Sequence, residues 1–254
     1  MEFDIVIGLH SIAELLRAKR RRVLHIFASE EALDELKKRE GISKNDLPAD
    51  KLILKASHDV QEEAKKWYKK ADYEYQRVPS NMFVIAEPVP ARDLNWLYDE
   101  MIKRDSFKLL VLDQVTDAHN GAAIMRTAAF YGVDAIMLSS KGSFGIGPGF
   151  NRIASGAVEY IEVVKVSALP KTLTKLADMG IQIIGFSEHA KDTLSTIEVK
   201  NKTCLVLGAE DFGLSNAVER LLTTIVALKP QGKIKSLNVS VAAAVAMEKI
   251  FGQN

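Results

Sequence analysis

The sequence predicts an α/β protein in which a mostly parallel sheet occupies the C-terminal part of the chain. Beyond residue 107, short apolar and often β-branched runs alternate with longer segments of helical periodicity. The short runs are apolar throughout, as in strands that are buried on both faces. A similar alternation of shorter segments in the first 87 residues predicts a second, small α/β domain.

The small N-terminal domain is predicted to span residues 1–87. Its expected helices are 8–18, 31–40 and 58–70, and its expected strands are 23–27, 51–57 and 80–87. Two prolines, Pro88 and Pro90, then indicate a linker, which we place at residues 88–107 with a helix at 93–104. No constellation of catalytic residues is apparent in this part of the sequence.

The larger domain is predicted to span residues 108–254. Its expected strands are 108–113, 135–139, 160–164, 181–187, 204–207 and 224–228. Its expected helices are 121–131, 169–179, 214–222 and 236–251. Ligands of parallel sheets bind at the carboxyl ends of the strands, so functional residues are expected in the loops that follow the strands.

Composition narrows the range of functions. The chain is 47% hydrophobic and 26% charged, with a formal net charge of +1, which is typical of a globular protein and not of a uniformly basic RNA-binding protein. No apolar run approaches the ~18 residues of a membrane span, and the acidic start lacks the features of a signal peptide, so we expect a cytoplasmic protein without a membrane segment. The basic clusters at 19–22 and 65–70 are either phosphate contacts or solvated helix faces.

Several kinds of site are not indicated. The single cysteine, Cys204, lies in an apolar run and is expected to be a buried thiol, and the histidines lack metal-ligand spacing, so no metal is expected. No G-x-S-x-G motif of a hydrolase is present. The glycine cluster at 142–150 is interrupted by Pro148 and has the wrong spacing for a nicotinamide dinucleotide, so it is expected to be a mobile loop that faces substrate.

Three loops at strand ends carry candidate functional residues. In the first, Asn120 falls at a predicted helix start and Arg126 lies six residues further on. An arginine in an apolar helix needs a partner, because its charge is permanent. That partner is either a ligand or an acid such as Asp113 or Asp117.

In the second loop, Gly208 and Gly213 flank Glu210 directly after a buried strand. This pattern indicates a close approach of the backbone to a ligand, with a tight turn as the alternative.

The third loop precedes the last helix. Pro230 and Gly232 favour a sharp turn, and either Ser236 or Asn238 is expected to cap the helix. Taken alone, this stretch is more typical of an ordinary C-terminal helix that docks on the rest of the fold.

Together the three loops resemble the motifs of the SpoU (TrmH-type) branch of the SPOUT RNA methyltransferases. The matching residues are Asn120, Arg126, Gly208, Glu210, Gly213, Leu214, Gly232, Ser236, Leu237, Asn238, Val239 and Ser240. Ala122 and Lys229-Pro230 depart from the family pattern, and the segment 151–163 also resembles the family. Residues 8–16 and 81–87 resemble the L30e-like domain of the members that methylate a guanosine of large-subunit ribosomal RNA.

The resemblance implies a trefoil knot near the C-terminus and a homodimer whose active site is completed across the interface. It implies methyl transfer from S-adenosyl-L-methionine to a ribose 2'-hydroxyl of RNA, most simply a guanosine of 23S ribosomal RNA. Methylation of transfer RNA and a non-catalytic role in binding structured RNA are the alternatives. The N-terminal domain is then expected to bind the RNA substrate.

The resemblance also implies roles for individual residues. The catalytic set is Arg126, Asn120, Glu210, Ser236 and Asn238. The set that binds the methyl donor is Leu207, Gly208, Ala209, Leu228, Gly232 and Leu237. A guanidinium is a poor base because its pKa exceeds ~12, so we expect Arg126 to stabilise developing negative charge on the 2'-oxygen.

Overall fold

The structure, a computed structural model, describes residues 3–140, 143–194, 197–209, 212–234 and 236–252. The chain forms two compact units. The N-terminal unit contains Met1–Val89 and Ile146–Tyr160, and the C-terminal unit contains Pro90–Gly145 and Ile161–Asn254. Residues 146–160 therefore fold with the start of the chain, although the sequence around them belongs to the C-terminal unit.

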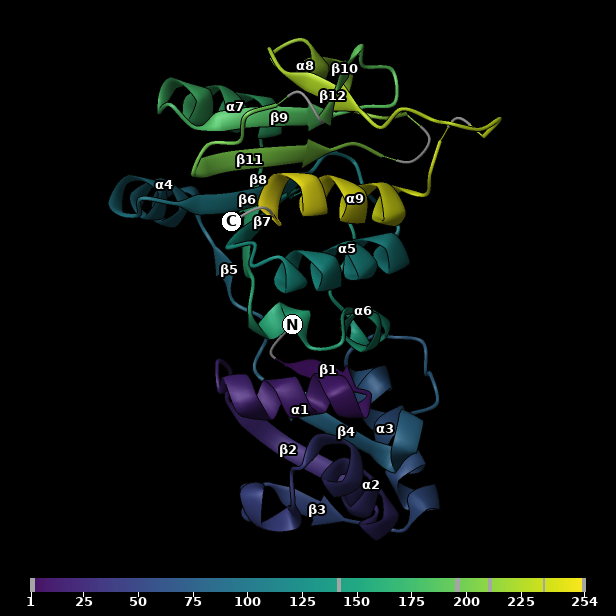
Figure 1. Ribbon diagram of the computed structural model, residues 1–254. Helices are drawn as coiled ribbons and strands as arrows, with labels where there is room; N and C mark the ends of the chain where they lie inside the picture. Colours follow the sequence, from purple (N-terminus) through teal and green to yellow (C-terminus); the bar gives the residue numbers. More distant parts are fainter. Residues whose placement is uncertain (1–2, 141–142, 195–196, 210–211, 235, 253–254) are drawn as a thin grey trace. The chain divides into compact units, whose positions relative to one another are not determined.

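The N-terminal unit is built on a four-stranded mixed sheet in the order β1-β4-β2-β3 (Figure 1). Its elements are β1 (Asp4–Ile7), α1 (Leu9–Ala18), β2 (Val23–Ala28), α2 (Glu30–Glu40), β3 (Leu52–Leu54), α3 (Ser57–Lys70), β4 (Met82–Ala86) and α6 (Pro148–Ala154), with short 3-10 turns at Lys44–Asp46, Pro79–Asn81 and Ala157–Glu159. The predicted helices and strands are all present. Strand β1 is not among the predicted strands, because four residues are too few to show a period.

The two faces of this sheet bury separate apolar clusters. Val6 and Ile26 face the cluster that includes α1 and α2, whereas the neighbouring residues Ile5 and Phe27 face the cluster that includes α3. This alternation follows from the two-residue period of a strand. The N-terminal unit therefore has a core of its own.

A buried ion cluster joins the two chain segments of the N-terminal unit. The Arg21 side chain is 1% exposed; its Nη1 lies 2.6 Å from Asp4 Oδ2, and its Nη2 lies 2.5 Å from Glu159 Oε1. Burial raises the pKa of the Asp4 carboxyl, although the charge of Arg21 acts in the opposite direction. Neither interpretation of the basic cluster at 19–22 holds for Arg21, because its guanidinium is buried and paired.

Helix α6 begins at Pro148, inside the segment 142–150 where a mobile loop is expected. Pro148 occupies the first turn, where its missing N–H is not needed, and Phe150 and Asn151 are buried. The Ser11 hydroxyl donates to the Asn151 carbonyl at 2.7 Å. The expectation of a mobile loop is therefore wrong for residues 148–150, and residue 142 lies outside the described part of the chain.

The C-terminal unit is an eight-stranded sheet in the order β10-β12-β9-β11-β6-β7-β8-β5, and all of its strand pairs are parallel (Figure 1). Its elements are β5 (Ala91–Arg92), α4 (Leu94–Lys103), β6 (Phe107–Leu112), α5 (Ala118–Phe130), β7 (Ala135–Ser139), β8 (Glu162–Val166), α7 (Leu169–Asp178), β9 (Gln182–Phe186), β10 (Asp192–Thr193), β11 (Lys202–Leu207), α8 (Asn216–Glu219), β12 (Ile225–Ala227) and α9 (Val239–Phe251). The predicted α/β fold with a parallel sheet is confirmed. The strand expected at 160–164 begins two residues later, because a 3-10 turn occupies Ala157–Glu159.

Helices cover both faces of the parallel sheet. Side chains of α4, α7 and α8 share one core cluster with β6, β7, β8 and β11, and this cluster includes Cys204, whose thiol pKa is raised by burial. On the other face, α5 and α9 lie side by side (Figure 1). Lys108 of β6 donates to the carbonyls of Phe251 at 2.9 Å and Tyr131 at 3.3 Å, so one cation serves the C-terminal ends of both helices.

The strand order creates a switch point at the centre of the parallel sheet. From β6 the chain runs outward to β7 and β8, whereas β11, β9 and β12 lie on the other side of β6. Leu207 at the end of β11 pairs in register with Leu112 at the end of β6. Loops leaving these two strands therefore diverge, and a crevice is expected between them.

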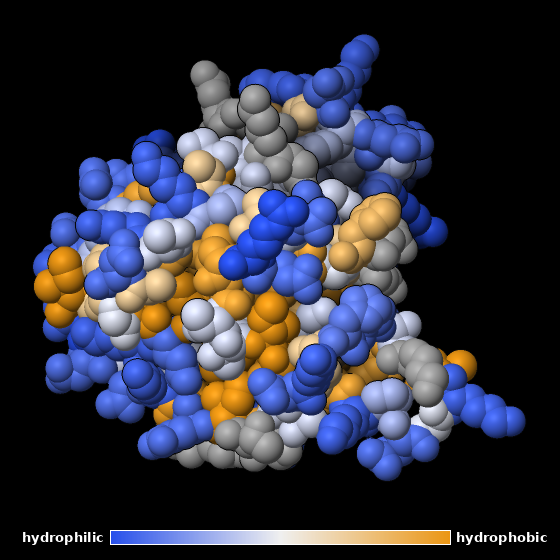
Figure 2. Space-filling view, turned by 90° about the horizontal axis from the view of Figure 1, so that it is seen from above, coloured by the Kyte–Doolittle hydropathy of each residue, from blue (hydrophilic) through white to orange (hydrophobic). Residues whose placement is uncertain are grey.

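The surface at the end of the C-terminal unit that bears α8, β10 and β12 shows hydrophobic side chains surrounded by hydrophilic ones (Figure 2).

Within the described part of the chain, none of the helices has the length and apolar character that crossing a membrane requires. The same described residues contain no group of three or more acidic, histidine or cysteine side chains arranged to hold a metal ion.

Candidate active site

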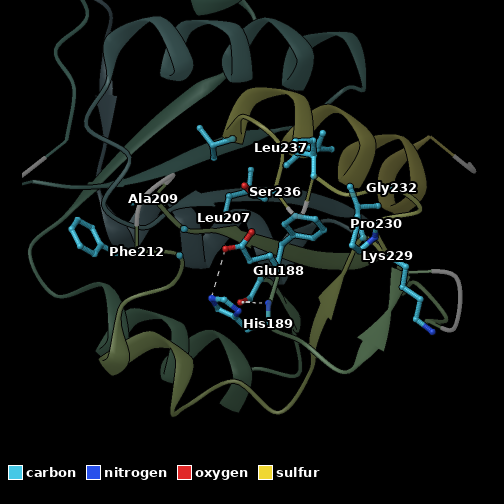
Figure 3. Close-up of a pocket in the computed structure, with 18 of the residues that line it drawn as sticks. Glu188, His189, Leu207, Ala209, Phe212, Lys229, Pro230, Gly232, Ser236 and Leu237 are labelled. Carbon is cyan, nitrogen blue, oxygen red and sulfur yellow. Dashed lines mark hydrogen bonds and ion pairs between the residues drawn. The ribbon is translucent and has the colours of Figure 1, made fainter.

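A first pocket of about 420 Å³ lies at the carboxyl ends of β9, β11 and β12 (Figure 3). Its lining residues are 186–189, 207–209, 212, 213, 228–234, 236, 237, 239 and 242. Leucines from three separate segments, Leu207, Leu228 and Leu237, supply apolar surface. Ser187 and Glu188 add polar groups. This volume and mixture are typical of a small-molecule site.

All six residues expected to bind the methyl donor line the first pocket, and Ser236 lines it as well. Lys229 and Pro230, which depart from the family pattern, are exposed residues of the same lining. Residues 186–189, at and after the end of β9, also line the pocket, and the sequence did not predict them as site residues. Their one signal is that position, because Glu188 and His189 form no motif. In the structure, Glu188 and His189 make a 3.7 Å ion-pair contact, and the His189 backbone N–H donates to Ser187 Oγ at 3.3 Å.

The loop after β11 explains both glycines of the second motif. Ala209 and Gly213 exchange backbone hydrogen bonds, each of 2.9 Å, which close the loop on itself. A Cβ atom at Gly208 would lie 2.1 Å from the Gly213 carbonyl carbon, so no larger residue fits there. Gly213 has φ of 65°, in the left-handed region. Glu210, the acid between these glycines, lies outside the described residues.

A second pocket of about 570 Å³ lies beside the first, over the ends of β6, β7, β8 and β11. It is lined by residues 113–117, 120, 139, 167–170, 209, 212, 215 and 239. Ala209, Phe212 and Val239 line both pockets. The two pockets therefore share a wall at the switch point of the sheet.

Asn120 and Asn238 connect the first and third motifs. The Asn238 side-chain amide donates to Asn120 Oδ1 at 3.1 Å, and Asn238 Oδ1 accepts from the Ser240 backbone N–H at 2.9 Å. Asn238, rather than Ser236, is therefore the cap of α9. Asp117 caps α5 and accepts from the Asn120 backbone N–H at 2.7 Å, so Asn120 lies in the first turn of the helix.

Arg126 lies on the exposed side of α5 and lines neither pocket. Six residues advance a helix by one and two-thirds turns, so Arg126 points away from Asn120. It makes no ion pair or hydrogen bond with any residue in the described ranges. The proposed ion pair with Asp113 or Asp117 is wrong, because Asp113 accepts from the Ser215 backbone N–H at 2.7 Å and Asp117 caps α5.

The departure of the first motif at Ala122 has a packing explanation. Ala122 is fully buried, whereas a Cβ atom at Gly121 would lie 2.4 Å from the Phe144 ring. The close approach on this turn of α5 thus occurs at Gly121. The glycine of this chain stands one residue before the usual position of the family because Phe144 packs there.

The first pocket fits S-adenosyl-L-methionine in size and in chemistry. The leucines suit an adenine ring, and the loop that Ala209 and Gly213 close places the main chain of Gly208 and Gly213 in the pocket lining. Residues 207–209, 228, 232 and 237 are those that would hold this donor.

Comparison with known proteins identifies relatives of the C-terminal unit and of the whole chain. Residues 108–248 match the model of the SpoU rRNA Methylase family. The 23S rRNA (guanosine-2'-O-)-methyltransferase RlmB of Nitrosomonas europaea is 36% identical over 146 residues, which cover 58% of this chain and 56% of that protein. The RlmB of Pseudomonas aeruginosa is 31% identical over 257 residues, which cover 99% of this chain and 97% of that protein.

The fold is also found among solved structures. The SpoU methyltransferase AviRb from Streptomyces viridochromogenes, solved in complex with the cofactor AdoMet, superimposes with a TM-score of 0.74 at 20% identity, over 99% of this chain and 90% of that chain. At this identity the likeness concerns the fold.

Proposed function

The chain belongs to the SpoU rRNA methylase family, and from this membership we propose that it methylates the ribose 2'-hydroxyl of a guanosine in 23S ribosomal RNA. It is an RNA methyltransferase that uses S-adenosyl-L-methionine. The observation that carries the proposal is the pair of pockets that share a wall at the carboxyl edge of the sheet. One pocket suits the donor, and the other is open to the acceptor.

The donor supplies a methyl group already attached to a good leaving group, a sulfonium. The protein therefore has to align the 2'-oxygen with that methyl and assist loss of the hydroxyl proton. The first pocket fixes one partner through the loop at Gly208, and the link between Asn120 and Asn238 fixes the helix starts beside the shared wall. Preorganised groups of this kind avoid reorganisation during the reaction.

We assign to Arg126 the stabilisation of negative charge that develops on the 2'-oxygen. Its guanidinium is exposed and makes no ion pair within the described residues, so its charge remains available. Because Arg126 faces away from both pockets of its own chain, we propose that it acts at the active site of a second subunit. Ser236 and Glu210 complete the proposed catalytic set.

The proposed homodimer uses the exposed face of α5 and α9. Phe130 lies one turn after Arg126 on α5 and is 81% exposed, and Val241 on α9 is 49% exposed. Large apolar side chains beside an unpaired cation are typical of a surface that a partner covers. Sedimentation of the wild-type chain is expected to give a dimer, and Phe130→Glu is expected to give a monomer without methyl transfer.

The N-terminal unit is proposed to be the L30e-like domain that binds the RNA. Lys69 and Lys70 at the end of α3 are exposed, and Lys70 Nζ lies 4.8 Å from the centroid of the Trp67 ring. Cations and aromatic rings together suit phosphates and bases.

For α9, which lies against α5, we propose passage through the trefoil knot of the family. An enzyme that modifies ribosomal RNA would be cytoplasmic.

Transfer of labelled methyl groups from S-adenosyl-L-methionine to RNA tests the proposed function. Purified Arg126→Ala is expected to keep the fold and the donor affinity but to lose transfer by roughly 10²-fold or more, since preorganised charge stabilisation typically has this size. Near-normal turnover of this variant would refute the role of Arg126. A wild-type chain that binds RNA without binding the donor would support the alternative of a non-catalytic RNA-binding protein.

A further inference from the structure

The second pocket is acidic and contains no described cation. Asp113 and Asp117 line it, and none of its described lining residues is Lys, Arg or His. A phosphate would be repelled by two carboxylates that no lysine or arginine offsets. The pocket therefore suits a group that offers hydrogen-bond donors.

Asp113 is the more informative of the two acids. Asp113 is 4% exposed, and its Oδ2 accepts from the Ser215 backbone N–H at 2.7 Å. Its Oδ1 has no hydrogen-bond partner among the described residues. Asp113 Oδ1 is not one of the fully buried polar atoms that lack a partner, so it is open to the pocket. The backbone fixes one oxygen, and the other remains for a ligand in the pocket.

Phe212 supplies an aromatic surface at the wall that the two pockets share. It is 83% exposed, and it lies at the opposite end of the first pocket from Lys229 (Figure 3). An aromatic ring this exposed gains little from its own fold. RNA-binding proteins use such rings as platforms for bases that have left the helix.

We propose that the second pocket takes the guanine base of the target nucleotide, with Phe212 stacked on the base and Asp113 accepting from its Watson–Crick edge. This inference rests on the proposed function and names the base that the site selects. Guanine presents two adjacent donors, N1–H and the N2 amino group, whereas adenine, cytosine and uracil each present one donor group on that edge. Placing the base here puts its ribose beside the shared wall, next to the donor pocket.

The test uses an RNA hairpin that spans the methylated nucleotide, identified by mapping, with guanosine, inosine or adenosine at that position. Inosine keeps N1–H but lacks the N2 amino group. For the wild-type dimer, kcat/KM is expected to fall about tenfold from guanosine to inosine, the size of one lost hydrogen bond to a charged group. Asp113→Asn, which can still accept from Ser215, is expected to lose activity on guanosine and to show no difference between guanosine and inosine.

Phe212 is tested with the same guanosine hairpin. Phe212→Ala is expected to raise KM for the RNA about tenfold with little change in kcat or donor affinity, and Phe212→Trp is expected to restore KM. Asp178→Asn and Ile102→Ala change an exposed acid and an exposed apolar residue outside both pockets, and they serve as matched controls.

Equal kcat/KM for the guanosine and inosine hairpins, measured with the wild-type dimer alone, would overturn the inference. A guanosine preference that persists unchanged in Asp113→Asn would also overturn it. Methylation of a nucleotide other than guanosine would refute the inference but leave RNA methylation intact. Absence of methyl transfer to any RNA would refute the proposed function as well.

Discussion

The side-chain amide of Asn238 donates a hydrogen bond to the side-chain oxygen of Asn120, 3.1 Å away and 118 residues earlier in the chain. Asn238 caps α9, and Asn120 lies in the first turn of α5. The bond thus joins the starts of the two helices that lie side by side on one face of the sheet. It also brings the first and third sequence motifs together beside the wall between the pockets.

Two substitutions of Asn238 are expected to separate its role as the cap of α9 from its hydrogen bond to Asn120. Asn238→Ala removes the cap of α9 and should lower the free energy of unfolding by about 1 kcal/mol. Asn238→Asp keeps a capping oxygen but lacks the amide that donates to Asn120, so it should unfold like the wild type and yet methylate RNA more slowly. Urea unfolding and labelled methyl transfer measure the two effects.

Asn120→Ala provides the matching experiment from the other helix. It leaves the cap of α9 in place, so stability should change by no more than about 0.5 kcal/mol while methyl transfer falls. If Asn120→Ala and Asn238→Asp both methylate RNA at the wild-type rate, the link has no role in the reaction.

Gly208 tests the donor pocket. A Cβ atom at this position would lie 2.1 Å from the Gly213 carbonyl carbon, so Gly208→Ala has to open the loop after β11. We expect calorimetry with S-adenosyl-L-methionine to show at least a tenfold loss of affinity. Gly145→Ala is the control, since a Cβ atom there meets nothing within 4 Å and Gly145 lines neither pocket. Unchanged donor affinity in Gly208→Ala would place the donor elsewhere.

Removing Arg21 from its buried ion cluster is expected to lower stability strongly, and removing its two acidic partners as well is expected to restore most of it. Arg21→Met leaves the carboxylates of Asp4 and Glu159 buried without their cation, which should cost about 3–5 kcal/mol. Adding Asp4→Asn and Glu159→Gln removes both charges and should recover most of that loss. The free energy of unfolding in urea measures each variant. A triple variant no more stable than Arg21→Met would show that the ion pairs are not the cause.

Asp4 also predicts a pH dependence of stability. Its pKa in the folded chain is raised above the ordinary 3.8, so its contribution to stability is full below that value and is lost as the pH rises through the raised pKa. Asp4→Asn lacks this loss. Relative to the wild type, Asp4→Asn should therefore gain unfolding free energy as the pH rises from about 3.5 to neutrality. A difference that is constant, or that moves the other way, would contradict the assignment.

The sequence predicted those parts of the fold that depend on local pattern. The strands β6, β7, β9 and β11 are apolar runs because both faces of the sheet are covered, and their position in the sequence was accurate to about two residues. The second and third motifs, through their resemblance to the family, predicted six donor-binding residues, and all six line the first pocket.

The remaining features depend on tertiary placement and have no local signal. Residues 146–160 show nothing in their composition that predicts folding with the N-terminal unit, and Arg21 resembles any other member of a basic cluster. The second pocket gathers residues from four strand ends, so its acidic lining becomes visible only when the sheet order is known. Residues 186–189 line the first pocket, and their part in it likewise becomes visible only from the sheet order.

Mapping of ribose 2'-O-methylation across ribosomal and transfer RNA, in cells with and without this protein, tests the central claim most directly. The proposed function predicts that one guanosine of 23S ribosomal RNA loses its 2'-O-methyl group in cells without the protein and regains it with the wild-type chain but not with Arg126→Ala. An unchanged ribosomal map together with a lost methyl group in transfer RNA would contradict the substrate. Unchanged maps of both RNAs would contradict the proposed activity.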